Sequence, residues 1–430
     1  MTKIAILGCT GCKNRGVDAL VLCSLSGLSK VFPGALFSLF TWTSEYDRQR
    51  ISDSNVTIIE YPYRPRRLSP PPPASPQGRK QALRHLARRL KRSLSPQAAT
   101  TSHPLQSHLV CPVLQGRLQG FDLVVITGGD VYSSEYGLES LGYYLSLIHT
   151  AQSLGIPVAL LGHSIGRFSD PESKSAWLDA CQSISFLTAR DGITSDYLNS
   201  IHGMPANYHV TADVAFGLVK AKPYPAQRSH GLPLVALSVS AGIAQWAGIS
   251  LAEYTQAWLV IIRTILDDWK CDVVLIPHVQ ESYGDDRIIQ TNLHRQLAFD
   301  SRVSIAASDL SASEYKAIIA DADFLIAERM HAAVAGISSF VPTVIASYSL
   351  KAQGLVREAY CDHILQNSAP LYQASDYRDI SLILDTLKVA WSAREELRKS
   401  LRNNVPSLIE RASSNFVLLA EWYFRQHSDQ

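Results

Sequence analysis

The sequence of 430 residues lacks the long apolar runs of a membrane-spanning helix. A span needs about 20 consecutive apolar residues, and the apolar stretches near Leu160 and Ile262 are much shorter. Hydrophobic residues make up 46% of the chain and charged residues 18%. These proportions exclude a mainly disordered chain, a coiled coil and a collagen-like repeat. The length predicts two domains rather than one small core.

The cysteines do not form a disulfide framework. Seven of them are spread from Cys9 to Cys361, and an odd, scattered set favours a reduced, cytoplasmic protein. The apolar run at residues 4–7 is too short for a signal peptide and is better explained as a buried strand. Cys9 and Cys12 form a single CxxC with no second pair. We interpret it as a tight turn rather than a metal or redox site, and predict no metal.

Acidic residues are absent between Tyr61 and Phe121, where eleven Lys or Arg lie. The segment contains a run of prolines that neither a helix nor a strand interior accepts, so we predict an insertion at about residues 62–118. Leucines at helical spacing follow among the basic residues. They indicate either a solvated helix packed on its own domain or peripheral contact of residues 64–94 with an anionic inner membrane face. Nucleic acid binding is not expected, because no aromatic residues interleave with the charges.

The remaining sequence alternates short apolar runs with helical periodicity, which is typical of parallel strands covered by helices on both faces. We predict an α/β protein of two doubly wound, Rossmann-like domains with a cleft between them. A proline-marked boundary gives an N-terminal domain at residues 1–222, a C-terminal domain at 223–385 and C-terminal helices at 386–430. The expected strands are residues 4–7, 36–40, 56–59, 123–126, 158–161, 186–188, a short piece near Tyr208, 234–238, 273–276, 303–305, 324–327 and 343–346.

Residues that follow the strands are candidate ligand contacts, because open α/β sheets bind ligands beyond the carboxyl ends of their strands. Asn14 precedes the first helix, whose exposed N–H groups favour anions. Gly128 and Gly129 are expected in a turn that opens space for a ligand, where Asp130 either holds a sugar hydroxyl or caps the next segment. His163 lies between two glycines after a predicted buried strand. We expect it to face the cleft.

Further charged residues follow the later strands of both domains. Arg190 either contacts a ligand or pairs with Asp191 at a helix start. Asp213 follows the last strand of the first domain and is expected to face the second domain. His278 follows the second strand of the second domain.

The strongest feature follows the predicted strand at residues 324–327. Arg329 and His331 open a helix there, and both would be costly if buried without partners. They suit a dianionic ligand, since guanidinium grips phosphate or carboxylate in a fork and imidazole transfers a proton. Tyr348 and Lys351 follow the next strand.

With these residues the sequence resembles the polysaccharide pyruvyl transferase family. The resemblance rests on Asn14-Arg15-Gly16 with Asp18, Thr127-Gly128-Gly129, Gly162-His163-Ser164-Ile165-Gly166, Arg190-Asp191, Asp213, Pro277-His278, Arg329-Met330-His331, Tyr348, Lys351 and Gly354. Members of the family have a fold like that of GT-B glycosyltransferases. They transfer pyruvate from phosphoenolpyruvate onto a sugar, usually as a ketal that bridges two hydroxyls.

The resemblance implies a transferase of exopolysaccharide or cell-surface glycan biosynthesis. Its co-substrate would be phosphoenolpyruvate, its acceptor a sugar or lipid-linked glycan, and no cofactor is expected. The implied catalytic residues are Arg329 for the phosphate or carboxylate, His331 as proton donor and His163 as a second candidate. The implied substrate-binding residues are Asn14, Gly128, Gly129, Asp130, Arg190, Asp213, His278, Tyr348 and Lys351.

Two departures from the family pattern concern the acceptor side. The first turn carries Cys9 and Cys12, and Asp130 stands where many members have glycine. The alternative on the same architecture is a GT-B-type glycosyltransferase that uses a nucleotide sugar. A ligand-binding protein without catalytic activity is the third possibility.

Overall fold

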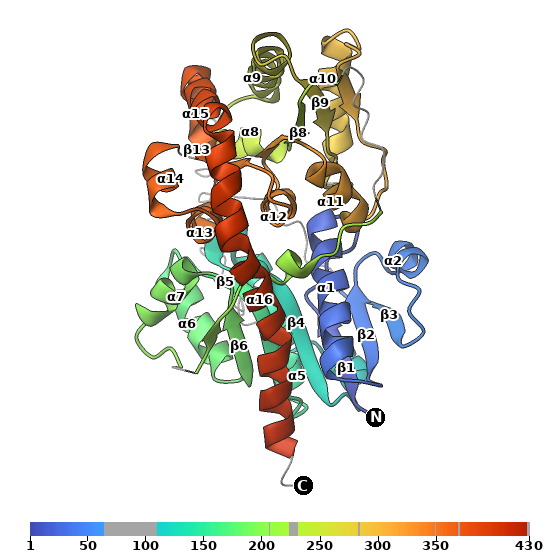
Figure 1. Ribbon diagram of the computed structural model, residues 1–430. Helices are drawn as coiled ribbons and strands as arrows, with labels where there is room; N and C mark the ends of the chain where they lie inside the picture. Colours follow the sequence, from blue (N-terminus) through green and yellow to red (C-terminus); the bar gives the residue numbers. More distant parts are fainter. Residues whose placement is uncertain are drawn as a thin grey trace, which may run out of the picture.

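The computed structural model describes residues 1–63, 110–205, 207–222, 231–282, 284–348, 350–368 and 370–427. They form two α/β domains, each built on a parallel sheet (Figure 1). Most of the predicted insertion, including residues 64–94 with their predicted membrane contact, lies outside the described residues, so these predictions stay untested. Residues 112–118, placed in the insertion by the sequence, form a helix that buries Leu114 and Leu118. No helix in the described ranges is both long and apolar enough to cross a membrane.

The first domain has a seven-stranded sheet in the order β3-β2-β1-β4-β5-β6-β7, with every neighbouring pair parallel. Its strands are β1 (Lys3–Leu7), β2 (Leu36–Thr41), β3 (Val56–Glu60), β4 (Leu123–Tyr132), β5 (Val158–Ile165), β6 (Phe186–Ala189) and β7 (His209–Val210). Its helices are α1 (Arg15–Val31), α2 (Ser44–Arg50), α4 (Pro112–Leu118), α5 (Leu138–Gln152), α6 (Pro171–Cys181) and α7 (Gly192–Asn199). The central strands are buried on both faces, which explains their continuous apolar sequences.

The second domain repeats this plan with a six-stranded parallel sheet in the order β10-β9-β8-β11-β12-β13. Its strands are β8 (Leu234–Ser238), β9 (Asp272–Leu275), β10 (Val303–Ile305), β11 (Phe324–Ala327), β12 (Thr343–Ser347) and β13 (Leu371–Gln373). Its helices are α8 (Gly242–Ala247), α9 (Leu251–Arg263), α10 (Asp286–Gln296), α11 (Ala312–Ala320), α12 (Met330–Ile337), α13 (Leu350–Ala359), α14 (Asp362–Asn367) and α15 (Ile380–Ser392). All twelve expected strands are present. The three-residue edge strand β13 was not predicted.

Strands β4 and β5 continue beyond their predicted ends, so the prediction of turns there is wrong. Gly128, Gly129 and Asp130 lie within β4, and His163 lies within β5. The glycine allows this extension, because a Cβ at Gly128 would lie 2.7 Å from the carbonyl oxygens of residues 161 and 162 on β5. Side chains larger than hydrogen would push the two strands apart.

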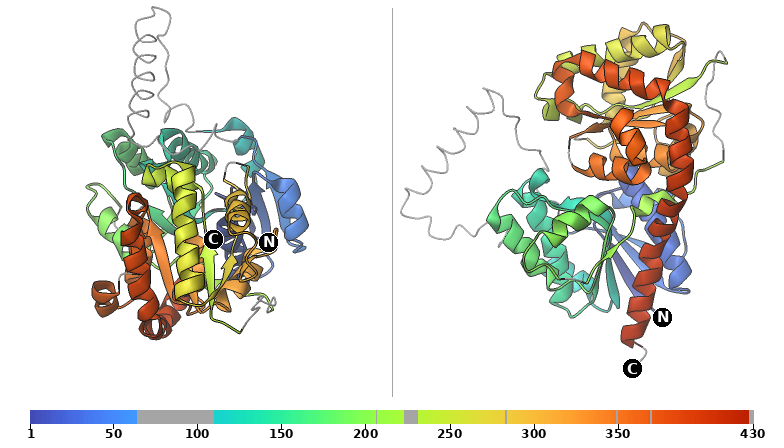
Figure 2. Two further views of the ribbon diagram at one scale, coloured as in Figure 1. Left: turned by 90° about the horizontal axis from the view of Figure 1, so that it is seen from above. Right: turned by 60° about the vertical axis from the view of Figure 1, so that its left-hand side comes forward.

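The last helix, α16 (Arg394–His427), connects the two domains. Figure 2 shows it leaving the second domain and running along the first, where it contacts α1, β5 and β6. Its buried Asn415 receives a hydrogen bond from Thr211 Oγ1 at 2.8 Å and donates to the Ala212 carbonyl at 3.0 Å. Helix α16 therefore supports the first domain.

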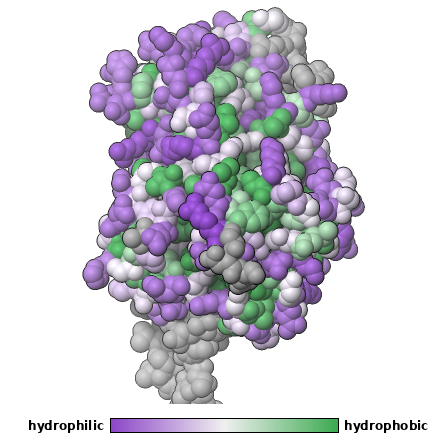
Figure 3. Space-filling model, turned by 60° about the horizontal axis from the view of Figure 1, so that its bottom comes forward, coloured by the Kyte–Doolittle hydropathy of each residue, from purple (hydrophilic) through white to green (hydrophobic). Residues whose placement is uncertain are grey.

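Apolar side chains are concentrated inside the two domains rather than on the surface. Two clusters of buried hydrophobic residues fill the layers between sheets and helices. On the face drawn in Figure 3, hydrophilic residues surround small apolar areas. Core burial of this kind supplies most of the free energy that stabilises the fold.

The contact between α1 and α16 depends on a glycine. A Cβ at Gly27 would collide with the ring of Phe416, which is buried. We expect Gly27→Ala to lower the free energy of unfolding by about 1–3 kcal/mol, the usual effect of overpacking. Urea denaturation of the full chain measures this. Gly116→Ala on α4, where a Cβ meets nothing within 4 Å, is the matched control and should be neutral or slightly stabilising. Equal stability of Gly27→Ala and wild type would contradict this packing.

Candidate functional site

The two domains meet where the strand order of each sheet reverses, between β1 and β4 and between β8 and β11. In open α/β sheets this is the position at which ligands bind. The loop after β1 pairs with the loop after β9. The Arg15 N–H donates to the His278 carbonyl and the Gln280 N–H donates to the Lys13 carbonyl, both at 3.0 Å. Asn14 caps α1 by accepting a hydrogen bond from the Gly16 N–H at 3.0 Å.

His331 reaches from the second domain to the first. It is the second residue of α12, and a Cβ at Gly16 would collide with its Nδ1. Its Nε2 lies 3.6 Å from Oδ2 of Asp213 and forms no hydrogen bond with any described residue. Two of the predicted site residues, from different domains, are thus brought face to face.

Asp213 is held by Arg190 at the end of the first domain's sheet. Arg190 Nη1 donates to Asp213 Oδ2 at 2.7 Å and Nε donates to Ser164 Oγ at 2.6 Å. Burial raises the pKa of Asp213, but His331 and Arg190 lower it more, so the pKa of this carboxyl lies well below its ordinary range. Asp191, the partner expected from the sequence, also forms an ion pair with Arg190, with 3.8 Å between its Oδ2 and Nε, and it caps the start of α7. Arg190 therefore mainly orients Asp213.

An ion pair crosses between the domains at Lys351. Its ammonium contacts Asp130, and it donates to Glu135 Oε2 at 3.0 Å and to Tyr136 Oη at 3.2 Å. Burial opposes ionisation of Asp130, but Lys351 and then Arg190 bring its pKa below the ordinary value. Asp130 therefore forms an ion pair with Lys351 instead of only capping the segment that follows it.

Arg329 lies at the N-cap position of α12 with a quarter of its side chain exposed. Its Nε and Nη2 donate to the two oxygens of Asp286 at 3.2 and 2.6 Å, and this fork fixes the guanidinium plane. Burial raises the pKa of Asp286, although Arg329 lowers it. Tyr348 stacks on Trp246 with 5.3 Å between ring centroids. Its pKa is raised by burial and responds to the charges of Asp130, Lys351 and Arg329.

Two adjoining pockets lie in this region. One is lined by residues of both domains, among them Arg190, Asp191, Asp213, Met330, Lys351 and Glu358. The other is lined by Glu135, Ser164, Arg167, Asp191, Tyr197 and Lys351, among others. Asp191 and Lys351 border both. Their mixed charges suit a ligand that carries hydroxyls as well as anionic groups.

Two of the predicted histidines are buried. His163 has no exposed surface, its Nε2 lies 3.2 Å from the Ile126 carbonyl, and its ring contacts Tyr132. Burial lowers its pKa to about 4, so it is neutral near pH 7. It lies beneath the charged residues rather than facing the pockets as expected. His278 is 3% exposed, and burial first, then the charges of His331 and Arg329, hold its pKa well below the ordinary value.

Two buried charged residues beside the site had no role assigned from the sequence, Arg15 and Glu328. Arg15 is fully buried and donates to Asp309 Oδ1 of the second domain at 3.0 Å and to Tyr46 Oη at 2.9 Å. Glu328 is buried directly before Arg329, where the Ser240 N–H at 2.6 Å and the Tyr377 hydroxyl at 2.7 Å donate to it. A carboxylate that immediately follows an apolar strand was the available signal for Glu328.

Comparisons with known proteins identify the same family and fold. The family model for polysaccharide pyruvyl transferase matches residues 14–349. Amylovoran biosynthesis protein AmsJ of Erwinia amylovora is 19% identical over 283 residues, which are 63% of this chain and 67% of that protein. Among solved structures, S. aureus MnaA with UDP is 12% identical with a TM-score of 0.60, covering 99% of this chain and 97% of that one.

Two further structures show the same architecture. A UDP-N-acetylglucosamine 2-epimerase is 12% identical with a TM-score of 0.54, over 99% of this chain and 96% of that one. The calicheamicin glycosyltransferase CalG4 is 10% identical with a TM-score of 0.52, over 98% of both chains. At these identities the structures indicate the fold alone. The predicted GT-B-like arrangement of two Rossmann-like domains is confirmed.

Glu328 should make stability depend on pH. Burial raises its pKa from 4.5 to about 7. Between these two pH values the folded protein therefore binds more protons than the unfolded chain. The stabilisation that protonated Glu328 provides is full below about pH 4.5 and is lost as the pH rises through 7. We therefore expect the free energy of unfolding of Glu328→Gln, measured relative to wild type, to rise by roughly 2–3 kcal/mol as the pH is raised from 5 to 8. Urea unfolding at several pH values measures the difference.

The control for this series is Glu410→Gln, at an exposed position of α16. Its stability should follow wild type across the pH range. Parallel curves for Glu328→Gln and wild type would contradict a titrating Glu328.

Proposed function

The chain belongs to the polysaccharide pyruvyl transferase family, and on this premise we propose that it transfers pyruvate from phosphoenolpyruvate to a sugar. The acceptor belongs to an exopolysaccharide or cell-surface glycan precursor, and the product is a ketal. The proposal is supported by two contacts across the domain boundary, His331 with Asp213 and Lys351 with Asp130. Arg329, held by Asp286 of its own domain, is one residue before the helix that carries His331. Asp213 and Lys351 line the pockets.

Arg329 and Lys351 are the proposed contacts of the donor. Phosphoenolpyruvate carries a phosphate and a carboxylate, and positioned cations stabilise both the bound anion and the departing phosphate. Each cation already has a carboxylate partner, Asp286 or Asp130. These partners fix the direction of the cations before the donor binds, so little reorganisation is needed on binding. Part of the binding energy is used to compete with these carboxylates.

His331 is the proposed general acid. It protonates the methylene carbon of phosphoenolpyruvate and thereby generates an oxocarbenium-like centre at the neighbouring carbon. One acceptor hydroxyl attacks this centre and releases its proton to a base. Cleavage of the carbon–oxygen bond then releases phosphate, and a second hydroxyl closes the ketal while its proton neutralises the leaving group. Asp213, ionised and 3.6 Å from Nε2, orients the imidazole for this proton transfer.

The acceptor is proposed to lie on the side of Asp130 and Tyr348. Carboxylates accept hydrogen bonds from sugar hydroxyls, and the stacked rings of Tyr348 and Trp246 offer an apolar surface to a sugar face. A lipid-linked acceptor would place the enzyme at the inner membrane face, where residues 64–94 would supply the contact. Both the identity of the acceptor and the membrane contact are proposals.

Binding of phosphoenolpyruvate should depend on Arg329. We expect wild type to bind the donor in isothermal titration calorimetry, and Arg329→Ala to bind about 10–100-fold more weakly, because a charge-assisted hydrogen-bond donor is lost. Arg329→Ala also leaves Asp286 unpaired. Arg329→Lys, which keeps the charge but loses the fork, should therefore show a loss as well. Arg302→Ala, which breaks a surface pair with Asp300, is the control. Wild type that binds uridine diphosphate and no phosphoenolpyruvate would favour the glycosyltransferase alternative instead.

Turnover should depend on His331 more than binding does. We expect His331→Ala to retain most of its affinity for phosphoenolpyruvate while acceptor-dependent phosphate release falls by about 10²–10⁴-fold, the range for loss of a general acid. The control is His294→Ala on α10, where the ring packs on Phe299, and its turnover should match wild type. Near-normal turnover of His331→Ala would show that another group is the acid.

A further inference from the structure

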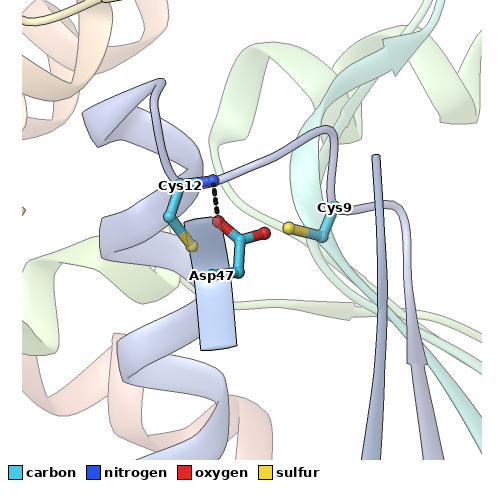
Figure 4. A group of neighbouring side chains, drawn as sticks. All are labelled: Cys9, Cys12 and Asp47. Atoms are coloured by element: carbon cyan, nitrogen blue, oxygen red, sulfur yellow. Dashed lines mark hydrogen bonds between the residues drawn. The ribbon is translucent and has the colours of Figure 1, made fainter. Parts of the chain in front are cut away.

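Cys9, Cys12 and Asp47 form a buried cluster that lines neither of the two pockets. The two cysteines lie in the loop between β1 and α1, and Asp47 lies on α2. Both sulfurs and a carboxylate oxygen lie within 4.8 Å of one another, and Figure 4 shows the carboxylate of Asp47 between the sulfurs of Cys9 and Cys12. None of the three residues is more than 1% exposed.

The hydrogen bonds around Asp47 hold its carboxylate in this position. Oδ1 accepts from the Cys12 N–H at 3.1 Å, Oδ2 accepts from Thr41 Oγ1 at 2.5 Å, and Thr43 Oγ1 lies 3.1 Å from both oxygens. Donors of this kind surround carboxylates that bind metal ions, where they orient the ligand. The three side chains therefore resemble a set of metal ligands whose carboxylate is already oriented by neighbouring hydrogen-bond donors.

The charges of the cluster point to a cation. Within the described ranges, Asp47 has hydrogen-bond donors but no ion pair with Lys, Arg or His, and a buried carboxylate without a counter-charge is costly. A divalent cation would supply the counter-charge, and it binds thiolates by displacing their protons.

We propose that Cys9, Cys12 and Asp47 bind one thiophilic divalent cation, for which Zn²⁺ is the best fit. Tetrahedral zinc with bonds of about 2.3 Å to sulfur and about 2.0–2.2 Å to oxygen places its ligands roughly 3.4–3.8 Å apart. The cluster reaches this spacing through small side-chain movements. A water molecule completes the tetrahedron. This proposal departs from the sequence-based prediction of no metal, which had not placed Asp47 beside the CxxC.

The cation would act on the position of the loop after β1. This loop carries Asn14 and Gly16 to the second domain, where they meet Val279 and His331. Binding would join the loop to α2 and so fix the start of α1 at the domain boundary. The site is structural, and it does not depend on the proposed transfer reaction.

Cobalt substitution tests the proposal on the full chain. The protein is purified under reducing conditions, freed of metal with a chelator and titrated with Co²⁺. We expect about one Co²⁺ per chain, a thiolate-to-cobalt charge-transfer absorption in the near ultraviolet, and loss of that absorption when Zn²⁺ is added. Absence of both the absorption and stoichiometric metal would overturn the proposal. A Cys9–Cys12 disulfide in unreduced protein that persists when Zn²⁺ is supplied during purification would overturn it too.

Matched variants locate the cation. Cys9→Ser combined with Cys12→Ser should abolish the absorption, whereas Cys23→Ser, at a buried cysteine of α1 outside the cluster, should retain it. Asp47→Asn should weaken Co²⁺ binding at least about tenfold. An unchanged affinity of Asp47→Asn would remove Asp47 from the ligand set and contradict the site. If the double variant does not fold, the spectrum of wild type and the affinity of Asp47→Asn still decide the question.

Discussion

The burial of ion pairs between the two domains constrains the rest of the molecule. Asp213 lies between Arg190 of its own domain and His331 of the other, and Lys351 reaches across to Asp130. Removing one partner of such a pair leaves a buried charge, at a cost of about 3–5 kcal/mol. The two sheets must therefore keep the relative position that matches these charges. Arg190, Asp213 and Lys351 also line the pockets, so groups that fix the domains also define what can bind between them.

The fold provides this meeting point through its topology. Each sheet reverses its strand order at one place, and the loops after β1, β4, β9 and β11 approach one another there. Gly16 allows α1 to begin against His331, while Asn415 of α16 ties the long C-terminal helix to the first domain. Cations that are already paired with carboxylates are well oriented, yet they bind a further anion only in competition with those partners. The arrangement therefore favours a ligand with several anionic and hydroxyl groups over a simple anion.

Much of this was predictable from the sequence, because parallel strands covered on both faces are apolar throughout and their ends carry polar residues. The strand positions and the grouping of Arg329 and His331 follow from that rule alone. The failures have tertiary causes. Gly128 lets β4 and β5 continue side by side, which buries His163 inside a strand. Besides Asp191, its neighbour in sequence, Arg190 pairs with Asp213, since the ends of β6 and β7 lie next to each other. No local pattern reveals either contact.

We propose that the charged groups at the domain boundary serve transfer of pyruvate from phosphoenolpyruvate to a glycan. Phosphorus NMR on the full chain, mixed with phosphoenolpyruvate and a panel of oligosaccharide and lipid-linked acceptors, tests this transfer. With one acceptor, we expect the phosphoenolpyruvate signal to be replaced by that of inorganic phosphate and the acceptor to gain a pyruvate ketal. Unchanged phosphoenolpyruvate with every acceptor, together with consumption of a nucleotide sugar added to the same mixtures, would contradict it.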